Sequence, residues 1–500
     1  MKSRIGTIIS VLCVAAGGNL LAYYIVRVPT QFEFVILATA LFAYPVVRNP
    51  LVGLYISFVL SPFIPYLRRL YYLAYDRPKI DPLIVLTDIV IIFMIVGLFF
   101  EFMERREEER PISQYKWLIL FYFVYMVFRT VVFNDLPLGD AVAQFKFYGP
   151  PVLFFFIGVV YAPQMGHLRN FWSLTVLLGV AAAAYGLNQL YTGYSTAEKI
   201  WFNSTQFTSL YVAGVARPFS FFQAPAAFAD YAMIAILASI LMFSWSKNPF
   251  KLVLLAPVAL FGYAILITSV RSNWIGMILT VVLWFIVNHV KGLPKRIGFL
   301  VALAAVYMAW EAVSGLLGGG LGVGDMIQAG AGRLSDQERL GPLISQRTSA
   351  ITNPFEEHSL ISRLNLWQFL IRTSFQPILG FMGRGVGALR ADSLYLTYLA
   401  ELGYPGLILI CSILVIFIRK GFHIIDNSKR PDVVVLASGV TVMNLVFVVI
   451  SITGSHIHSF PGDMYFWFWN GVLMKLSIAL QEPVAGTDHH DNTAVTRLPA

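Results

Sequence analysis

Cysteine and charge are both scarce in this chain. Its 500 residues include only 2 cysteines, Cys13 and Cys411, and both lie within apolar segments. This scarcity excludes a disulfide framework and a cysteine metal cluster, and it leaves both side chains the role of small core residues. Charged residues make up 13% of the chain against 57% hydrophobic residues, and the mean hydropathy is +0.70. These values lie far from those of soluble domains, so a lipid bilayer is the expected solvent.

Long apolar stretches recur along the whole chain. In lipid every backbone polar group must be satisfied within the protein, so only helices or closed barrels span a bilayer. Stretches near twenty residues favour helices, and they predict an all-α polytopic integral membrane protein with about 14 transmembrane helices, or about 12 to 14 because some runs are short and flanked by proline. The first stretch is interpreted as an uncleaved helix rather than a signal peptide. The predicted segments are 6–26, 31–47, 50–66, 82–104, 117–134, 149–162, 170–191, 226–245, 249–268, 273–290, 298–316, 394–418, 432–453 and 463–480.

Lysine and arginine collect in alternate short loops, which the positive-inside rule assigns to the cytoplasm. With a cytoplasmic N-terminus, the basic short loops fall on the cytoplasmic side along the whole chain, except that the basic residues between 68 and 79 fall outside. This arrangement predicts that both termini are cytoplasmic and that the two longest loops, 192–225 and 317–393, lie outside. The predicted units are helices 1 to 11 in 1–316, the large external loop 317–393, helices 12 to 14 in 394–480, and a disordered cytoplasmic tail in 481–500.

The surplus of positive charge does not indicate a nucleic-acid partner. The formal net charge is +9 at pH 7. Lysine and arginine are nevertheless scattered between apolar stretches, and they are not gathered into one basic domain with interleaved aromatic residues. The positive-inside rule accounts for a surplus of this kind. We therefore expect membrane lipid, and no nucleic acid, among the partners.

The loop 317–393 is rich in arginine and contains no lysine. A planar guanidinium grips phosphate through two parallel hydrogen bonds, whereas an ammonium acts as a point charge. The bias therefore suits an anionic lipid head group, including a diphosphate. The alternative is a solvated loop that touches lipid phosphates without specificity. The arginines are Arg333, Arg339, Arg347, Arg363, Arg372, Arg384 and Arg390.

The same loop contains two local patterns. Apolar Leu360, Leu364, Trp367 and Ile371 recur at helical spacing and predict an amphipathic helix over 360–375, suited to lie at the membrane interface or to pack on the rest of the loop. The following glycine-rich run, from Gly380 to Gly387, allows tight turns and a close backbone approach to a ligand. It is not a Walker motif.

Four polar residues precede or begin the next apolar segment. On a helix Asp392, Tyr395, Tyr398 and Glu401 share one face through their three-residue spacing. An acid at the mouth of a membrane helix is costly unless it faces protein or water, so Asp392 is a candidate base that activates a hydroxyl group. The alternative role for Asp392 is an N-cap.

Further cations and histidines lie on the same predicted outer side. Arg217 precedes one helix, and Arg271 lies in a turn so tight that two helices are barely separated. Both place a positive charge where lipid meets water, and the alternative role for each is a snorkelling anchor. His456 and His458 in the last external loop are interpreted as ordinary loop residues, with contact to an acceptor as the alternative.

Taken together, these segments resemble the superfamily of bacterial O-antigen ligases and polysaccharide polymerases, membrane glycosyltransferases that use undecaprenyl-diphosphate-linked glycans. The resemblance covers roughly residues 210–410. Arg217 to Phe228 matches an Arg-led stretch that opens a helix, although Ala226 stands where the family usually has Asn. Ser269-Val-Arg271 matches a Ser-Arg pair, with one residue intervening. The later positions that match are Arg363, Trp367, Gly383, Gly385, Glu401 and Gly403.

The resemblance implies a GT-C-like helical bundle with a large periplasmic loop, set in the bacterial inner membrane. It also implies an enzyme that polymerises undecaprenyl-diphosphate-linked repeats at the periplasmic face, as an O-antigen or exopolysaccharide polymerase with a chain-length regulator as partner. Ligases of the family carry His-Asn where this chain has Asp392-Ser393. That departure disfavours the alternative of a ligase that transfers glycan to lipid A core.

The implied site residues follow from the same resemblance. Asp392 or Glu401 would deprotonate the acceptor, and Arg271 would stabilise charge on the leaving group. The diphosphate and the substrate would be bound by Arg217, Arg271, Arg363, Arg384, Arg390 and Tyr395. Because arginines can replace a divalent ion and the external loops hold no Asp-x-Asp motif, we expect no metal and no cofactor. The alternative from another class is a lipid-linked oligosaccharide flippase, which would line a central cavity with arginines, and Arg129 is the residue that favours it.

Overall fold

A computed structural model describes most of the chain. The described residues are 33–74, 83, 86–104, 116–205, 210–212, 215–246, 249–290, 292, 295, 358–374, 377–389 and 391–480. The predicted segments 6–26 and 298–316 and the predicted tail 481–500 lie outside them, as does most of the predicted loop 317–393.

The described residues are almost entirely helical, as predicted. Every predicted segment within them coincides with a helix, and only one two-residue pair of antiparallel strands is present among the described residues. The elements are α2 (Glu33–Arg48), α3 (Pro50–Ala74), α4 (Leu86–Glu104), α5 (Lys116–Val131), α6 (Leu138–Phe145), α7 (Gly149–Tyr161), α8 (Met165–Tyr191), α9 (Thr196–Thr205), β1 (Tyr211–Val212), β2 (Val215–Ala216), α10 (Pro225–Trp245), η5 (Pro249–Leu255), α11 (Ala256–Thr268), α12 (Arg271–His289), α16 (His358–Ser374), α17 (Pro377–Met382), α18 (Leu394–Asn427), α19 (Pro431–Ile450), η7 (His456–His458) and α20 (Gly462–Ala479). The prediction missed the short elements α6, α9 and α17.

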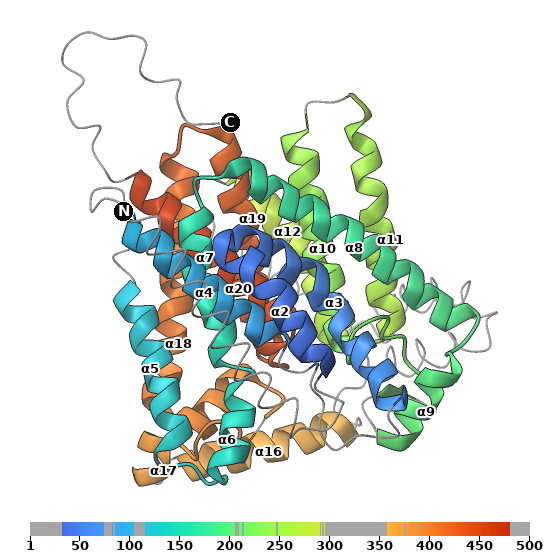
Figure 1. Cartoon of the computed structure of the whole chain (residues 1–500), viewed down its shortest axis with the longest axis vertical. Helices are drawn as coiled ribbons and strands as arrows, with labels where there is room; N and C mark the ends of the chain where they lie inside the picture. The colour runs from blue at the N-terminus through green and yellow to red at the C-terminus, as the bar shows by residue number, and fades with distance from the viewer. Residues whose placement is uncertain are drawn as a thin grey trace, which may run out of the picture.

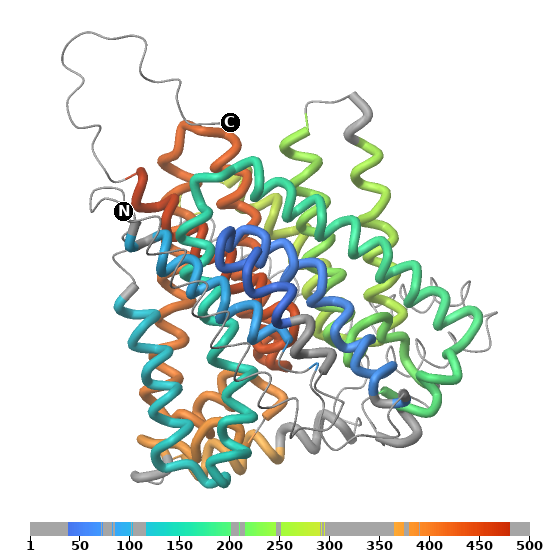
Figure 2. Tube along the Cα trace, viewed as in Figure 1, coloured from blue at the N-terminus to red at the C-terminus, as the bar shows by residue number. Residues whose placement is uncertain are grey.

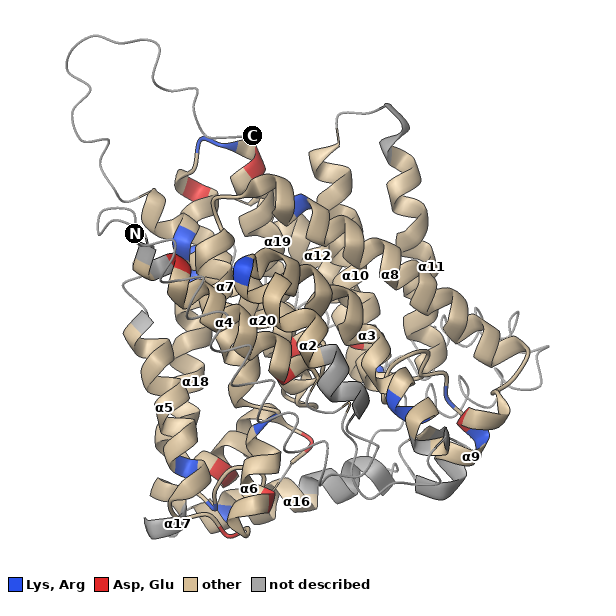
Figure 3. Cartoon of the chain, in the orientation of Figure 1, with Lys and Arg blue, Asp and Glu red and all other residues tan. Residues whose placement is uncertain are grey.

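Long apolar helices make this a multi-pass membrane protein. Among the described residues, 7 helices are long and apolar enough to cross a membrane. Their outer faces carry large apolar side chains that a soluble protein would bury, such as Ile408, which is 63% exposed, and Phe285, which is 56% exposed. Charged residues are sparse along these helices, which Figure 3 shows mostly in tan.

The most deeply buried helix, α20, lies in the middle of the bundle. It packs against α7, α10, α18 and α19, and its place among them is visible in Figure 2, where it is red. Two glycines let α7 and α20 approach closely, because a Cβ on Gly158 would collide with the carbonyl of Phe468 and one on Gly471 with the carbonyl of Phe155. Small residues at such crossings are typical of helix packing in membranes.

The helices α10, α12, α18 and α20 all begin at one end of the bundle, which we call the lower end after its position in Figure 1. The short helices α6, α9 and α17 and the helix α16, which lies across the bundle, gather there too. The helices α11 and α19 finish at the same end, since they run in the opposite direction. Arg271, at the start of α12, and Tyr395, near the start of α18, therefore lie at this end.

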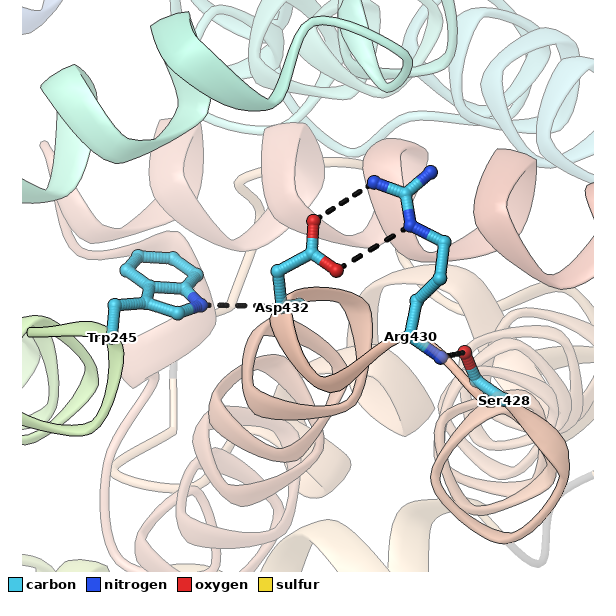
Figure 4. A network of polar contacts seen from close by, with 4 residues as sticks. All are labelled: Trp245, Ser428, Arg430 and Asp432. Carbon is cyan, nitrogen blue, oxygen red and sulfur yellow. Dashed lines mark hydrogen bonds and ion pairs between the residues drawn. The ribbon is translucent and has the colours of Figure 1, made fainter. Parts of the chain in front are cut away.

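At the opposite end of the bundle, a polar network joins α10 to the first turn of α19 and the loop before it (Figure 4). The indole N–H of Trp245 donates to the carbonyl of Asp432 at 3.2 Å, and the Arg430 guanidinium donates to the Asp432 carboxylate at 2.8 Å. The backbone N–H of Arg430 donates to Ser428 at 3.2 Å. The hydrogen bond with Asp432 raises the pKa of Arg430 above its ordinary value, so this guanidinium remains charged.

Candidate functional site

Arg217 extends from the segment before α10 to the end of α11. Its backbone N–H donates to the carbonyl of Leu210 at 2.8 Å, which fixes the chain beside the two short strands. Its Nη1 donates to the carbonyls of Thr268 and Ser269 at 3.3 and 3.5 Å. The last carbonyls of a helix lack partners within the helix, and here the guanidinium supplies donors to them. Arg217 is thereby anchored at the junction of α11 and α12.

Arg271 begins α12 immediately after this junction. Ser269 adopts a left-handed conformation, with φ 53°, and Val270 is extended, so the chain reverses direction between the two helices. The Arg271 side chain is half-buried at the first position of α12. The structure thus brings the predicted pair Arg217 and Arg271 to one turn, residues 268–271, at the N-terminus of a 19-residue helix. Two guanidiniums and a helix N-terminus form a local environment suited to an anion.

A buried carboxylate and a buried histidine lie next to the same turn. Asp230, in the second turn of α10, is 1% exposed, and His456, in η7, is 4% exposed. Asp230 Oδ1 is 2.7 Å from His456 Nδ1, and it also accepts a 2.7 Å hydrogen bond from Nδ2 of Asn273. Asn273 lies in the first turn of α12, two positions after Arg271. These three residues connect α10, α12 and the last loop of the lower end.

The outer nitrogen of the His456 ring faces a glycine. His456 Nε2 and Asp230 Oδ2 are buried and have no hydrogen-bond partner among the described residues. A Cβ placed on Gly454 would lie 2.5 Å from Nε2. Gly454 therefore packs directly against the His456 ring, and any other residue at 454 would force the ring or the backbone to shift.

A second histidine of the same loop is part of an aromatic network. His458 Nε2 is 2.9 Å from the hydroxyl of Tyr398, and the two rings stack with centroids 5.5 Å apart. The Tyr398 hydroxyl also hydrogen-bonds the hydroxyl of Tyr122, and the ring of Tyr148 lies 4.5 Å from His458. This network joins α5, α18 and the loop before α20, and it occupies the nitrogen of His458 that faces Tyr398.

The four polar residues predicted to share one face of α18 do not converge on one site. Asp392 is exposed, and the residue at the N-cap position is Ser393, so the N-cap alternative for Asp392 is wrong. The Tyr395 hydroxyl donates to the carbonyl of Val448 on α19 at 2.8 Å. Glu401 is 1% exposed and lies under the glycine-rich run. The two tyrosines are held by different neighbours, since Tyr395 binds α19 and Tyr398 binds His458.

The glycine-rich run packs on protein at its central positions. Gly383 has φ 70°, and a Cβ there would lie 2.5 Å from the carbonyl oxygen of Glu401. The backbone N–H groups of Arg384 and Gly385 donate at 2.8 Å to the carbonyls of Ala400 and Glu401, which precede the kink of α18 at Gly403. The close backbone approach that Gly383 permits is thus to α18, and an approach of the glycine-rich run to a ligand stays a prediction.

The predicted loop arginines differ in how they are placed. Arg384 Nη1 lies 4.0 Å from the Asp135 carboxylate, and the backbone carbonyl of Arg384 accepts from the backbone N–H of Asp135. These contacts tie the loop after α5 to the glycine-rich run. Arg363 lies on α16, but its side chain is outside the described residues, and Arg390 is outside them altogether. The predicted amphipathic helix is present as α16, although Leu370 is its buried apolar residue and Ile371 is exposed.

A pocket of about 60 Å³ lies next to the loop that carries His456. Its lining includes Phe460, from the loop that carries His456, and Gln223, from the segment that carries Arg217. Lys146 Nζ is 3.0 Å from the Asp88 carboxylate within this lining, and Asp463 also contributes to it. This volume is well below that of a typical ligand pocket, so the pocket is not assigned to the substrate.

Asp230, Asn273 and His456 were not among the predicted site residues. One signal was present in the sequence, because Asp230 is an acid inside an otherwise apolar helix, and such residues are functional candidates. Within the described part of the chain, no group of three or more His, Cys, Asp or Glu side chains could hold a metal ion. Models of known protein families and the sequences of curated proteins gave no match to this chain.

Proposed function

We propose that this protein is a membrane glycosyltransferase that polymerises undecaprenyl-diphosphate-linked oligosaccharide repeats. One observation carries the proposal. Arg217 donates to the turn 268–271 that contains Arg271, and the buried Asp230–His456 pair lies beside this turn through Asn273. An anion-binding turn and a proton-accepting group in one place are what the transfer of a glycan from a diphosphate to a hydroxyl requires.

The two arginines would act on the donor. As the bond between the sugar and the diphosphate breaks, negative charge grows on the departing phosphate oxygen. Cations held in position before the reaction stabilise that charge most effectively. Arg217 is held by the carbonyls of α11, and Arg271 is held by its place at the first position of α12. The isoprenoid chain would lie along the apolar outer surface of the bundle.

The active end would be periplasmic and the protein would reside in the bacterial inner membrane. Support comes from the opposite end of the bundle, where Arg430 lies in a short loop with Lys429, as the positive-inside rule expects for a cytoplasmic loop. The described helices α11 and α19 begin at this opposite end, and they alternate with those that begin at the lower end, as the proposed topology requires.

The buried arginines argue against the transporter alternative. A flippase would place cations around a central cavity within the membrane. Arg129 instead donates to the carbonyls of Val132 and Gly383, at 2.9 and 3.1 Å, and Arg69 donates to the carbonyls of Ser220 and Phe222, at 2.9 and 2.8 Å. Both guanidiniums thus bind backbone at the lower end.

The test is an Arg271→Ala variant expressed in a strain that lacks the native protein. Glycans of the surface and of the lipid-linked pool are compared on gels. We expect loss of long polymer and accumulation of lipid-linked single repeats that are accessible from outside. Arg372→Ala is the matched control, since Arg372 is exposed on α16 at the same end, and it should retain polymer.

The same gels separate the alternatives. Long glycan chains that remain unattached in the deletion strain would indicate a ligase, and the polymerase assignment would then be wrong. Single repeats that accumulate on the cytoplasmic side would indicate a transporter. Normal polymer in the deletion strain would exclude all three functions.

A further inference from the structure

We propose that His456 is the base that accepts the proton of the acceptor hydroxyl, and that Asp230 and Asn273 are the residues that position it. This inference rests on the proposed glycosyl transfer and adds a residue to its mechanism. It replaces the predicted bases Asp392 and Glu401, of which the first is exposed and the second lies beneath the glycine-rich run.

The hydrogen bonds of the pair select one form of the imidazole ring. Asp230 Oδ1 lies 2.7 Å from His456 Nδ1, and a carboxylate oxygen can only accept, so Nδ1 carries the hydrogen. Asn273 Nδ2 donates to the same oxygen at 2.7 Å and fixes its orientation. A neutral imidazole with hydrogen on Nδ1 presents a lone pair at Nε2. This is the relation between a carboxylate, an imidazole and a hydroxyl that serves general base catalysis in hydrolases.

The lone pair at Nε2 is kept available by its surroundings. His456 is 4% exposed, and its Nε2 has no partner among the described residues. Gly454 lets the backbone pack directly against the ring, because a Cβ there would lie 2.5 Å from Nε2. A base in such a place is shielded from bulk water, and the hydrogen-bonding capacity of its Nε2 is unused among the described residues.

The base and the cations are held by the same helix turn. Asn273 follows Arg271 by two positions, which is about 3 Å along the axis of α12. A movement of the N-terminus of α12 would therefore displace the leaving-group cation and the support of the base together. The leaving-group cation and the base therefore keep their positions relative to each other.

The step balances as follows. The acceptor oxygen transfers its proton to His456 Nε2 and forms a bond to the anomeric carbon of the donor glycan. The bond from that carbon to the diphosphate oxygen breaks, and its electron pair leaves with undecaprenyl diphosphate, next to Arg217 and Arg271. Asp230 stabilises the imidazolium until it releases the proton to water, and no other reactant is needed.

The test uses the full-length protein in liposomes with undecaprenyl-diphosphate-linked repeats as substrate. His456→Gln should lower kcat by about 100-fold or more while the KM for the donor stays near its native value. Asp230→Asn should lower kcat in the same way, since an amide no longer requires hydrogen on Nδ1. His458→Gln is the matched control in the same loop and should retain kcat within about threefold, because its Nε2 is occupied by Tyr398.

Gly454→Ala tests the base without removing it. The added methyl would lie 2.5 Å from Nε2, so the ring must shift, and kcat should fall while the KM for the donor stays near its native value. The proposal is overturned if His456→Gln keeps kcat within about threefold, or if the KM rises while kcat is unchanged. Native protein that forms no polymer from these repeats would instead contradict the proposed function, so the two failures are distinguishable.

Discussion

Two regions at the lower end of the bundle carry arginines, and they use them differently. At the turn 268–271, Arg217 and Arg271 lie beside a buried carboxylate and histidine from two other elements. At the glycine-rich run, Arg384 is half-buried and pairs with Asp135 at 4.0 Å, in a segment that packs on α18. A loop that is rich in arginine therefore does not by itself identify a site. A site is identified where polar side chains from several elements come together.

The largest expected effect is on Arg217. Arg217→Ala should reduce polymer formation by about 100- to 1,000-fold, because it removes a cation from the place where leaving-group charge develops. Arg217→Lys should restore little, since an ammonium is a point charge and cannot replace the planar guanidinium, whose Nη1 donates to both carbonyls. Polymer formation from lipid-linked repeats is the measurement. If Lys restores full activity, the contact with the end of α11 has no part in the reaction.

The next largest effect is on stability, at Gly383. Gly383→Val should destabilise the protein by about 1–3 kcal/mol, because φ 70° strains an L-residue and the Cβ would lie 2.5 Å from the Glu401 carbonyl. Thermal unfolding in detergent measures the loss. Gly139→Val is the matched control, since a Cβ at Gly139 meets nothing within 4 Å. Equal unfolding temperatures for the two variants would contradict the packing role of the glycine-rich run.

A smaller effect is expected for Arg384. Arg384→Ala removes a long and partly exposed ion pair, so stability should fall by about 1 kcal/mol or less. Polymer formation should stay within about threefold of the native level, in contrast to Arg217→Ala. Thermal unfolding and polymer formation are both measured on the Arg384→Ala variant. A loss of activity as large as that of Arg217→Ala would show that the two regions contribute equally to polymer formation.

The smallest effect is expected at the opposite end of the bundle. Arg430→Ala breaks an exposed ion pair with Asp432 and should cost at most about 1 kcal/mol, with unchanged polymer formation. Labelling of a cysteine placed at 430 and another at 372 adds a test of sidedness. Only the second should react with an impermeant reagent from the periplasm. Reaction of both positions from the same side would contradict the proposed topology.

Much of the fold was predictable from apolar runs. Their lengths located the long helices, since a bilayer demands a span of about twenty residues. The amphipathic helix before α18 was predicted as well, because its period is a local property. Short helices such as α6 and α9 were missed, since eight- and ten-residue segments bear no membrane-length signal. The tight turn at Arg271 was predicted, but Arg217 was expected only on the same surface, and its contact with that turn came from the structure.

The sequence alone determined the solvent, the helical class and the end of the molecule where cations gather, because hydropathy and charge are properties of short segments. Only the tertiary structure decided which polar groups meet. Asp230 and His456 are 226 positions apart, and Asn273 comes from a third element. Burial of a carboxylate and an imidazole is tolerated only where partners from other elements supply hydrogen bonds. No local pattern records that requirement, so it could be read only where α10, α12 and the last loop come together.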